Sequence, residues 1–378
     1  MPAPRTSFSA FAVAAPGLAA LVGEELRDLG ADVTQVDDAG VSFAADHAAL
    51  YRANIGSRIA SRIVVRAASF RAAHFSELEK RARAVDWERW IAPGRPVMVR
   101  ASSRKSRLFH TGGIAERACE AIAHSVGEVR RDEAVDDDDD VGDAQLVIVR
   151  LERDQCTISI DSSGALLHRR GYRQAVAKAP LRETLAAAIL RAAGYTGGAP
   201  LVDPCCGSGT IPIEAAMIAR HMAPGLQRTF AFERWPSFAS KAWGTVQERA
   251  RDAVRATGLP TIVGTDRDAG AIEAARANAA RAGVADDIVF DRRPLSRSEP
   301  PSGAAGLLVS NPPYGARIGD PEALRSLYAA FGAHARGLFA GWRVALLATD
   351  PRLVGQARLG LRPVLRTVNG GIRVSLFA

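Results

Sequence analysis

Apolar residues in the first half of the chain recur at spacings that alternate between helix and strand. Leu18, Leu21, Val22 and Leu26 fall on one face of a helix, and two short strands are expected on either side of residues 38–40. Residues 47–66 read as a helix that runs into a strand. Further on, 95–103 alternates as a strand, 111–127 returns to helical spacing, and 144–164 predicts a hairpin turning near 152–154. This half therefore predicts small α+β domains.

From Ala179 the pattern changes to strands alternating with helices. A helix is expected over 180–194, and apolar strands are expected at 201–203, 261–266, 288–290, 306–310 and 343–348. Such alternation is typical of a mostly parallel sheet with helices on both faces. Residues 362–368 and 372–378 flank an Asn-Gly-Gly turn, so the sheet is expected to close with an antiparallel hairpin. That ending departs from an ordinary dinucleotide-binding fold.

Length and cysteine content limit the class of protein. A chain of 378 residues predicts two or three domains, with no 18-residue apolar run and no secretory signal in its first 30 residues. A soluble, cytoplasmic protein is expected. The four cysteines have no CxxC spacing, which favours neither a metal site nor a disulfide framework.

The charge distribution points to a polyanionic partner. Net charge is +8, and the first 180 residues are neutral only because residues 132–143 hold eight acids and no base. A basic body favours nucleic acid. The alternative is a compositional bias, because 45 of the 49 cations are arginine. The acidic run is expected to be a solvated hairpin tip or a disordered loop that does not touch RNA.

A glycine turn follows the first strand of the second half, in "LVDPCCGSGTIPIEAAM". Gly207 and Gly209 leave the backbone open to a ligand, and the helix that begins near Thr210 offers free N–H groups. The nicotinamide pattern would need a third glycine where this chain has Pro212, and a phosphate loop would need a Lys-Ser/Thr pair. Both of these cofactor classes are therefore disfavoured.

Acidic residues beside the turn indicate a different cofactor. Asp203 suits an ammonium better than a pyrophosphate, and S-adenosylmethionine carries an ammonium in its amino-acid moiety. Asp266, at the end of the next strand, can accept both ribose hydroxyls, and we expect Asp268 to cap the following helix instead. Cys205 and Cys206 have no histidine near them in the sequence, so we interpret them as the wall of the loop and not as nucleophiles.

The stretch "LLVSNPPYG" places Asn311, Pro312, Pro313 and Tyr314 at the end of the fourth strand, beside the cofactor in this topology. An exocyclic amine on a base is a poor nucleophile because its lone pair is shared with the ring. The amide oxygen of Asn311 and the carbonyl of Pro312 can accept both amine hydrogens and so free the lone pair. Two prolines hold the strand end rigid, and Tyr314 offers a ring on which the target base can stack. The alternative is a simple strand stop.

These residues resemble those of a known family, the THUMP-domain class I methyltransferases, and within it the bacterial 23S rRNA guanine-N2 methyltransferases of the RlmL type. The resemblance covers nearly the whole chain and includes "SRIASRI", "VDWERWIAPG", "LHRRGYR", "APLRETLAAAIL", "DPCCGSGTIPIEAAM", "APGLQR" and "SNPPYG". It implies a ferredoxin-like region over 1–58, a THUMP RNA-binding domain over 59–165, a linker over 166–180 and a Rossmann-like methyltransferase domain over 181–378.

The resemblance also implies roles for individual residues. Asn311 to Tyr314 would hold guanine, and the cofactor-binding set would be Asp203, Pro204, Cys205, Cys206, Gly207, Ser208, Gly209, Thr210, Asp266 and Arg267. In one respect the chain departs from the family. Pro294 stands where relatives place an aspartate for the adenine amine, so adenine recognition is left either to backbone groups or to Asp291.

Two clusters of cations with interleaved aromatic residues are candidates for RNA contact. The first is Arg104, Lys105 and Arg107, beside Phe109 and His110. The second is Arg169, Arg170, Tyr172 and Arg173. The alternative for both clusters is a solvated loop.

Taken together, the sequence predicts methyl transfer from S-adenosylmethionine to the exocyclic N2 of a guanosine in 23S rRNA. The alternatives are the same chemistry on tRNA, a DNA adenine-N6 methyltransferase, and an RNA-binding assembly factor that does not catalyse. The DNA alternative leaves the first 165 residues without a purpose. The intact Asn-Pro-Pro-Tyr stretch disfavours the last alternative.

Overall fold

The computed structural model describes residues 7–127, 129, 142–174, 181–313 and 321–378. The chain divides into two compact units. The first comprises Met1–Ala14, Val22–Leu167 and Arg228–Glu248, and the second comprises Ala15–Leu21, His168–Gln227 and Arg249–Ala378. Helices α1 (Ala19–Asp28) and α7 (Ser240–Asp252) each cross a boundary between these segments.

The first unit is built on one seven-stranded sheet in the order β2-β3-β1-β4-β7-β6-β5. Its strands are β1 (Phe8–Val13), β2 (Asp32–Asp37), β3 (Gly40–Ala45), β4 (Arg62–Arg71), β5 (Val97–Arg104), β6 (Gln145–Glu152) and β7 (Gln155–Asp161). The helices that lie wholly within it are α2 (His47–Gly56), α3 (Phe75–Arg83), η1 (Trp87–Arg89), α4 (Thr111–Val126) and η2 (Ala231–Arg234). β5 and β6 are parallel, and the other neighbouring strands are antiparallel.

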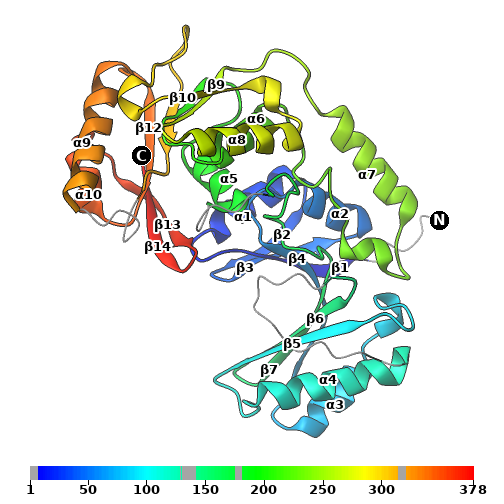
Figure 1. Ribbon diagram of the computed structural model, residues 1–378. Helices are drawn as coiled ribbons and strands as arrows, with labels where there is room; N and C mark the ends of the chain where they lie inside the picture. Colours follow the sequence, from blue (N-terminus) through cyan, green and yellow to red (C-terminus); the bar gives the residue numbers. More distant parts are fainter. Residues whose placement is uncertain (1–6, 128, 130–141, 175–180, 314–320) are drawn as a thin grey trace. The chain divides into compact units, whose positions relative to one another are not determined.

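Local sequence accounts for much of this unit. Leu18, Val22 and Leu26 are buried, as the helical spacing predicts. The β6–β7 turn falls on Arg153 and Asp154, both with positive φ, which confirms the hairpin. Helices α3 and α4 pack on each other beside β5, β6 and β7 (Figure 1). The domain boundary expected between residues 58 and 59 falls just before β4, which pairs with both β1 and β7, and it stays a prediction.

The segment Arg228–Glu248 follows α6 (Thr210–Ala219) of the second unit in the sequence, yet it completes the core of the first. The ring of Phe232 stacks on Tyr51 with centroids 4.2 Å apart, and Trp235 meets Trp90 edge to face at 4.8 Å. The indole N–H of Trp235 donates to Oε1 of Gln145 at 2.9 Å. Trp235 is buried, so the first unit depends on a segment distant in sequence.

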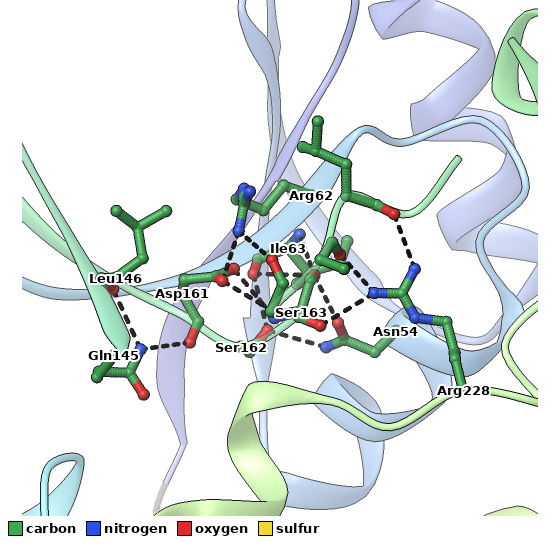
Figure 2. A network of polar contacts seen from close by, with 12 residues as sticks. Asn54, Arg62, Ile63, Gln145, Leu146, Asp161, Ser162, Ser163 and Arg228 are labelled. Carbon is green, nitrogen blue, oxygen red and sulfur yellow. Dashed lines mark hydrogen bonds and ion pairs between the residues drawn. The ribbon is translucent and has the colours of Figure 1, made fainter. Parts of the chain in front are cut away.

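A buried polar network connects β4, the end of β7 and Asn54 of α2 (Figure 2). Arg62 pairs with Asp161 at 2.5 Å, and both side chains are almost fully buried. Asn54 accepts from the hydroxyl of Ser163 at 2.7 Å, and the guanidinium of Arg228 donates to the Ser163 carbonyl at 3.1 Å. Burial raises the pKa of Asp161 although the charge of Arg62 lowers it. This network holds the end of β7 against β4.

The second unit is a seven-stranded sheet in the order β10-β9-β8-β11-β12-β14-β13. Its strands are β8 (Leu201–Asp203), β9 (Ile262–Asp266), β10 (Ile288–Arg292), β11 (Leu307–Ser310), β12 (Arg343–Ala348), β13 (Pro363–Asn369) and β14 (Ile372–Phe377). Its helices are α5 (Glu183–Ala192), α6 (Thr210–Ala219), α8 (Ala269–Ala282), η3 (Ala285–Asp287), η4 (Leu295–Arg297), α9 (Pro321–Gly337) and α10 (Pro351–Gln356). Five strands are parallel, and β14 enters antiparallel between β12 and β13.

Helices cover both faces of the second sheet, with α5, α6 and α8 on one side and α9 and α10 on the other (Figure 1). Tyr328, Phe331 and Phe339 of α9 and the turn after it pack against Val202 and Leu308 of the central strands. Because β8, β9 and β11 are parallel neighbours, their carboxyl ends meet at one edge. The mostly parallel sheet with an antiparallel final hairpin is thereby confirmed.

Candidate functional site

The glycine turn joins β8 to α6 at the carboxyl edge of the second sheet. Gly207 and Gly209 both have positive φ, of +52° and +83°, which glycine adopts without strain. A Cβ on Gly209 would lie 3.0 Å from the ring of Phe290, a tight contact that adds to the preference of this left-handed backbone for glycine. A Cβ on Gly207 would meet nothing within 4 Å, so the turn is open to a ligand at this residue.

Asp203 ends β8 as a buried carboxylate. Its Oδ1 accepts hydrogen bonds from the backbone N–H of Cys205 at 3.1 Å and from the hydroxyl of Ser310 at 2.9 Å. Burial raises the pKa of Asp203 to about 7, and the charge of Asp266 adds to that rise. A cation placed beside this carboxylate would favour its charged form.

Asp266 ties the end of β9 to the same turn. Its Oδ2 accepts from the N–H of Gly207 at 3.0 Å, and its Oδ1 accepts from the N–H of Asp268 at 3.0 Å. Asp268 accepts from the N–H groups of Gly270 and Ala271, which confirms it as the cap of α8. The neighbouring Arg267 is exposed.

The two adjacent cysteines lie in the wall of the turn. Burial raises the pKa of the Cys205 thiol to about 12, and it also raises the pKa of the Cys206 thiol. Asp203 and Asp266 add to both shifts. Both thiols are therefore protonated at neutral pH, and a protonated thiol is a poor nucleophile.

Asn311 and Pro312 follow directly after β11, which pairs with β8. The Oδ1 atom of Asn311 is buried and has no hydrogen-bond partner within the described residues. Buried polar atoms are nearly always paired, so such an atom calls for an explanation, and a donor on a bound substrate is one. Pro312 is buried and Pro313 is partly buried, whereas Tyr314 lies outside the described residues.

The first predicted RNA cluster lies on the surface between β5 and α4. The side chains of Arg104 and Arg107 are 70% and 67% exposed, and they make ion pairs of 3.9 Å with Glu152 and Asp154. Lys105 is exposed as well. Phe109 is 68% exposed, and its ring lies 4.2 Å from that of His110. These positions are available to a nucleic acid.

The second predicted RNA cluster is mostly interior, and we correct the expectation for three of its members. Arg170 and Tyr172 are 3% and 1% exposed, and both contact Oε1 of Glu214 on α6. Arg173 pairs with Glu183 at 3.2 Å and donates to the Leu181 carbonyl at 2.5 Å. Their cations meet carboxylates of the protein itself, so these three side chains do not face RNA. Arg169 is exposed and stays a candidate.

Two residues near the turn were not singled out by the sequence. Ser310 precedes Asn311 and bonds to Asp203. Asn278 donates from Nδ2 to the carbonyl of Ser208 at 3.0 Å. Asn278 shares the buried face of α8 with Ile272, Ala275, Ala279 and Ala282. A polar residue on an otherwise apolar helix face is the sequence signal that could have identified it.

An apolar cavity of about 450 Å³ lies elsewhere in the second unit. Leu307 and Arg343, which begin β11 and β12, line it together with Phe339 and Trp342. It is therefore at the amino ends of the strands, away from the turn. The Arg343 guanidinium already donates to the carbonyls of Ala193 and Gly194. We assign the functional site to the turn, where Asp203, Asp266 and the amide oxygen that has no partner among the described residues are found.

Comparison with known proteins identifies the family to which the chain is similar. A model described as the RMKL-like methyltransferase domain matches residues 170–368, one for the RlmL ferredoxin-like domain matches 9–64, and one for the THUMP domain matches 72–161. The chain is 39% identical over 376 residues to "Ribosomal RNA large subunit methyltransferase K/L" of Syntrophotalea carbinolica, covering 97% of this chain and 52% of that protein. It thus spans about half the length of that relative.

Two further matches cover whole chains. "Putative RNA methyltransferase slr0064" of Synechocystis sp. is 35% identical, with 97% of this chain and 95% of the relative covered. The crystal structure of SMU.472, a putative methyltransferase complexed with SAH, is 32% identical with a TM-score of 0.86, covering 98% of this chain and 97% of that one.

The sheet order, the open glycine turn and these matches define a class I methyltransferase that uses S-adenosylmethionine. Within that class the chain belongs to the family of RlmK/L-like methyltransferases, with an RlmL ferredoxin-like domain and a THUMP domain before the catalytic domain. No helix in the described ranges is long and apolar enough to cross a membrane. Across those same ranges, no group of three or more metal-ligating side chains occurs.

Proposed function

We propose that this protein transfers a methyl group from S-adenosylmethionine to the exocyclic N2 of a guanosine in 23S rRNA. The observation that carries the proposal is the buried Oδ1 of Asn311, which is unpaired among the described residues and lies one residue beyond the Ser310 hydroxyl that bonds to Asp203. In this proposal, that oxygen accepts an amine hydrogen beside the cofactor turn. The name of the Syntrophotalea relative supports large-subunit rRNA as the substrate.

The residues of the turn fit the cofactor. Gly207 leaves open space, Asp203 offers a carboxylate for the ammonium, and Asp266 stands at the strand end where the ribose is expected. The full set proposed to hold the cofactor is Asp203, Pro204, Cys205, Cys206, Gly207, Ser208, Gly209, Thr210, Asp266 and Arg267. Bound there, S-adenosylmethionine supplies an electrophilic methyl group on a sulfonium sulfur.

The chain's own contribution is to prepare the amine. Oδ1 of Asn311 accepts one amine hydrogen and the carbonyl of Pro312 accepts the other, which withdraws the nitrogen lone pair from the ring. As the new N–C bond forms, the C–S bond breaks, and one amine proton then leaves to water. Alignment of the two partners supplies most of the acceleration, so no charged general base is needed. We propose Pro313 and Tyr314 as the remaining members of this site.

RNA is held, in this proposal, by the exposed cluster of Arg104, Lys105 and Arg107. Arg104 and Arg107 are mostly exposed and make only long ion pairs of 3.9 Å with Glu152 and Asp154, which suits exchange for phosphates, and the open ring of Phe109 suits an unpaired base. Arg169 is the member of the second cluster that we keep. This surface belongs to the region that the THUMP model matches, apart from Arg169.

Methyl transfer from tritiated S-adenosylmethionine to rRNA, tRNA and DNA, all purified from a deletion strain, tests the substrate. We expect label in 23S rRNA, followed by mass-spectrometric mapping of one N2-methylguanosine that is missing in the deletion strain. Label in tRNA alone would select the same chemistry on another RNA. Label in DNA alone would refute the proposal. It would instead support transfer to adenine N6, whose amine hydrogens an amide oxygen can accept equally well.

A further inference from the structure

The Arg-Gly-Tyr-Arg motif, although it does not face RNA, is joined by hydrogen bonds to the helix that follows the cofactor turn. The hydroxyl of Tyr172 donates to Oε1 of Glu214 at 3.2 Å, and Nε of Arg170 contacts the same oxygen at 3.4 Å. Glu214 lies on α6 and is fully buried. Residues 170–172 are therefore fixed to the helix that starts at the glycine turn.

A second connection reaches the turn itself through α8. Nε of Arg281 donates to the Tyr172 carbonyl at 2.6 Å, and Nη2 of Arg281 donates to Oδ1 of Asn278. Asn278, which is 1% exposed, donates from Nδ2 to the Ser208 carbonyl at 3.0 Å. A continuous run of hydrogen bonds thus leads from Tyr172 through Arg281 and Asn278 to Ser208.

The hydrogen bond from Asn278 to the Ser208 carbonyl acts on the part of the turn with the least restrained backbone. Ser208 lies between Gly207 and Gly209, and glycine restrains a peptide less than any other residue does. The peptide that joins Ser208 to Gly209 is held at both of its polar atoms. Its N–H donates to the Cys206 carbonyl at 2.9 Å, and its C=O accepts from Asn278. This peptide sets the direction of the N–H groups where α6 begins.

The amide of Asn278 is not needed for packing. The other buried side chains of α8 are Ile272, Ala275, Ala279 and Ala282, so an alanine would match the helix at this position. The cost of desolvating a buried asparagine is offset only when both the oxygen and the nitrogen of its amide are hydrogen-bonded, as they are here. Its donor and acceptor connect the turn to Arg281.

We propose that Asn278, oriented by Arg281, is a positioning residue for cofactor binding: it fixes the Ser208 peptide so that the turn is formed before S-adenosylmethionine arrives. The inference rests on the assignment of the turn to the cofactor, made above. It adds two residues of α8 to the determinants of cofactor affinity. It also gives the Arg-Gly-Tyr-Arg motif a role in the catalytic unit.

The test uses Asn278→Asp in the full chain. Aspartate has the same size and keeps the acceptor for Arg281, but it cannot donate to the Ser208 carbonyl. We expect the Kd for S-adenosylmethionine and for S-adenosylhomocysteine, measured by calorimetry without RNA, to rise about tenfold. Turnover at saturating cofactor and RNA should stay within about twofold of wild type, since no reacting atom is touched. Arg281→Ala should raise both Kd values by a smaller factor of about three.

Asn54→Asp is the matched control. Asn54 is equally buried and donates to the Leu50 carbonyl and to Ser162, but it lies in the first unit. It should lower the melting temperature and leave the Kd for S-adenosylhomocysteine unchanged.

An unchanged Kd in Asn278→Asp overturns the proposal. A loss of turnover at saturation in proportion to a lower melting temperature overturns it too, because that pattern is general instability. Asp266→Ala separates this inference from the assignment beneath it. If Asp266→Ala weakens S-adenosylhomocysteine and Asn278→Asp does not, only the positioning role fails; if neither weakens it, the assignment of the turn fails.

Discussion

The hydroxyl of Ser310 donates to Oδ1 of Asp203 at 2.9 Å, across the neighbouring strands β11 and β8. One bond thus links the residue before Asn311 to the residue that opens the cofactor turn. The proposed acceptor for the substrate amine and the proposed carboxylate for the cofactor ammonium are therefore connected through one hydrogen bond. Alignment of this kind is what a methyl transfer without a charged base requires.

Asn311→Ala should remove most of the turnover and leave cofactor affinity intact. The variant loses the amide oxygen that accepts an amine hydrogen, while Asp203, Gly207 and Asp266 are untouched. We expect kcat to fall about a hundredfold or more, in the range seen when one pre-aligned hydrogen-bonding group is lost. Single-turnover methyl transfer to rRNA measures the rate, and calorimetry with S-adenosylhomocysteine measures the affinity. Unaltered turnover would exclude the role given to Asn311.

Cofactor binding should tighten as pH rises through the pKa of Asp203, which burial raises to about 7. Below that pH the carboxyl is neutral in the free protein, and an ammonium ligand must displace its proton. Affinity should therefore fall by up to about tenfold per pH unit on the acid side. Calorimetry in buffers of different ionisation enthalpy should detect the released proton. Asp203→Asn should show neither the pH dependence nor the proton.

The raised pKa of Asp203 has the opposite effect on the stability of the fold, which should decrease as pH rises. Stability that Asp203 contributes is fully present below its ordinary pKa and is lost as pH rises to about 7, because the buried anion is disfavoured.

Ser310→Ala removes a hydrogen bond that lowers the pKa of Asp203. The midpoint of cofactor binding should then move to higher pH, and a midpoint that stays in place would contradict the Ser310–Asp203 link.

Two variants should separate charge from stacking on the proposed RNA surface. Arg107→Ala removes one exposed cation, so the slope of log affinity against log salt should decrease by about 1. Phe109→Ala removes an exposed ring and should weaken rRNA binding roughly tenfold while the slope stays the same. Val364→Ala, an exposed apolar side chain of β13, is the control and should change neither. Equal behaviour of all three would place the RNA elsewhere.

Trp235→Ala should destabilise the first unit by about 3–5 kcal/mol, because a buried indole and its bond to Gln145 are lost. Phe109→Ala in the same unit should cost about 0.5 kcal/mol or less, since its ring is exposed. Denaturant unfolding monitored by tryptophan fluorescence and circular dichroism compares them. A small loss in Trp235→Ala would mean that Arg228–Glu248 is not part of the core.

Local sequence was sufficient where neighbours in the chain decide the structure. The positive φ of Arg153 and Asp154 lies where the hairpin was expected, and Asp268 rather than Asp266 caps α8. These features depend on residues a few positions apart. The candidate site residues at the strand ends could also be predicted from the sequence, because the carboxyl ends of neighbouring parallel strands lie at the same edge of a sheet.

The interior position of Arg170 and Tyr172 could not be found in this way. Cations beside an aromatic ring give the same sequence signal whether they face a phosphate or a buried carboxylate. The deciding partner, Glu214, is 42 residues from Tyr172 and lies within an otherwise apolar helix. In the same way, the spacing of Phe232 and Trp235 does not show whether their rings pack in the core of the first unit or in that of the second.

By itself, then, the sequence determined the class of fold, the open turn and the Asn-Pro-Pro strand end, because periodicity, glycine and proline act locally on the backbone. The tertiary structure alone decided that Ser310 meets Asp203, that Asn278 holds Ser208, and that the Arg-Gly-Tyr-Arg motif faces the interior. Those outcomes depend on which distant groups burial brings together, and a buried charge or amide is stable only with a partner that its own segment does not supply.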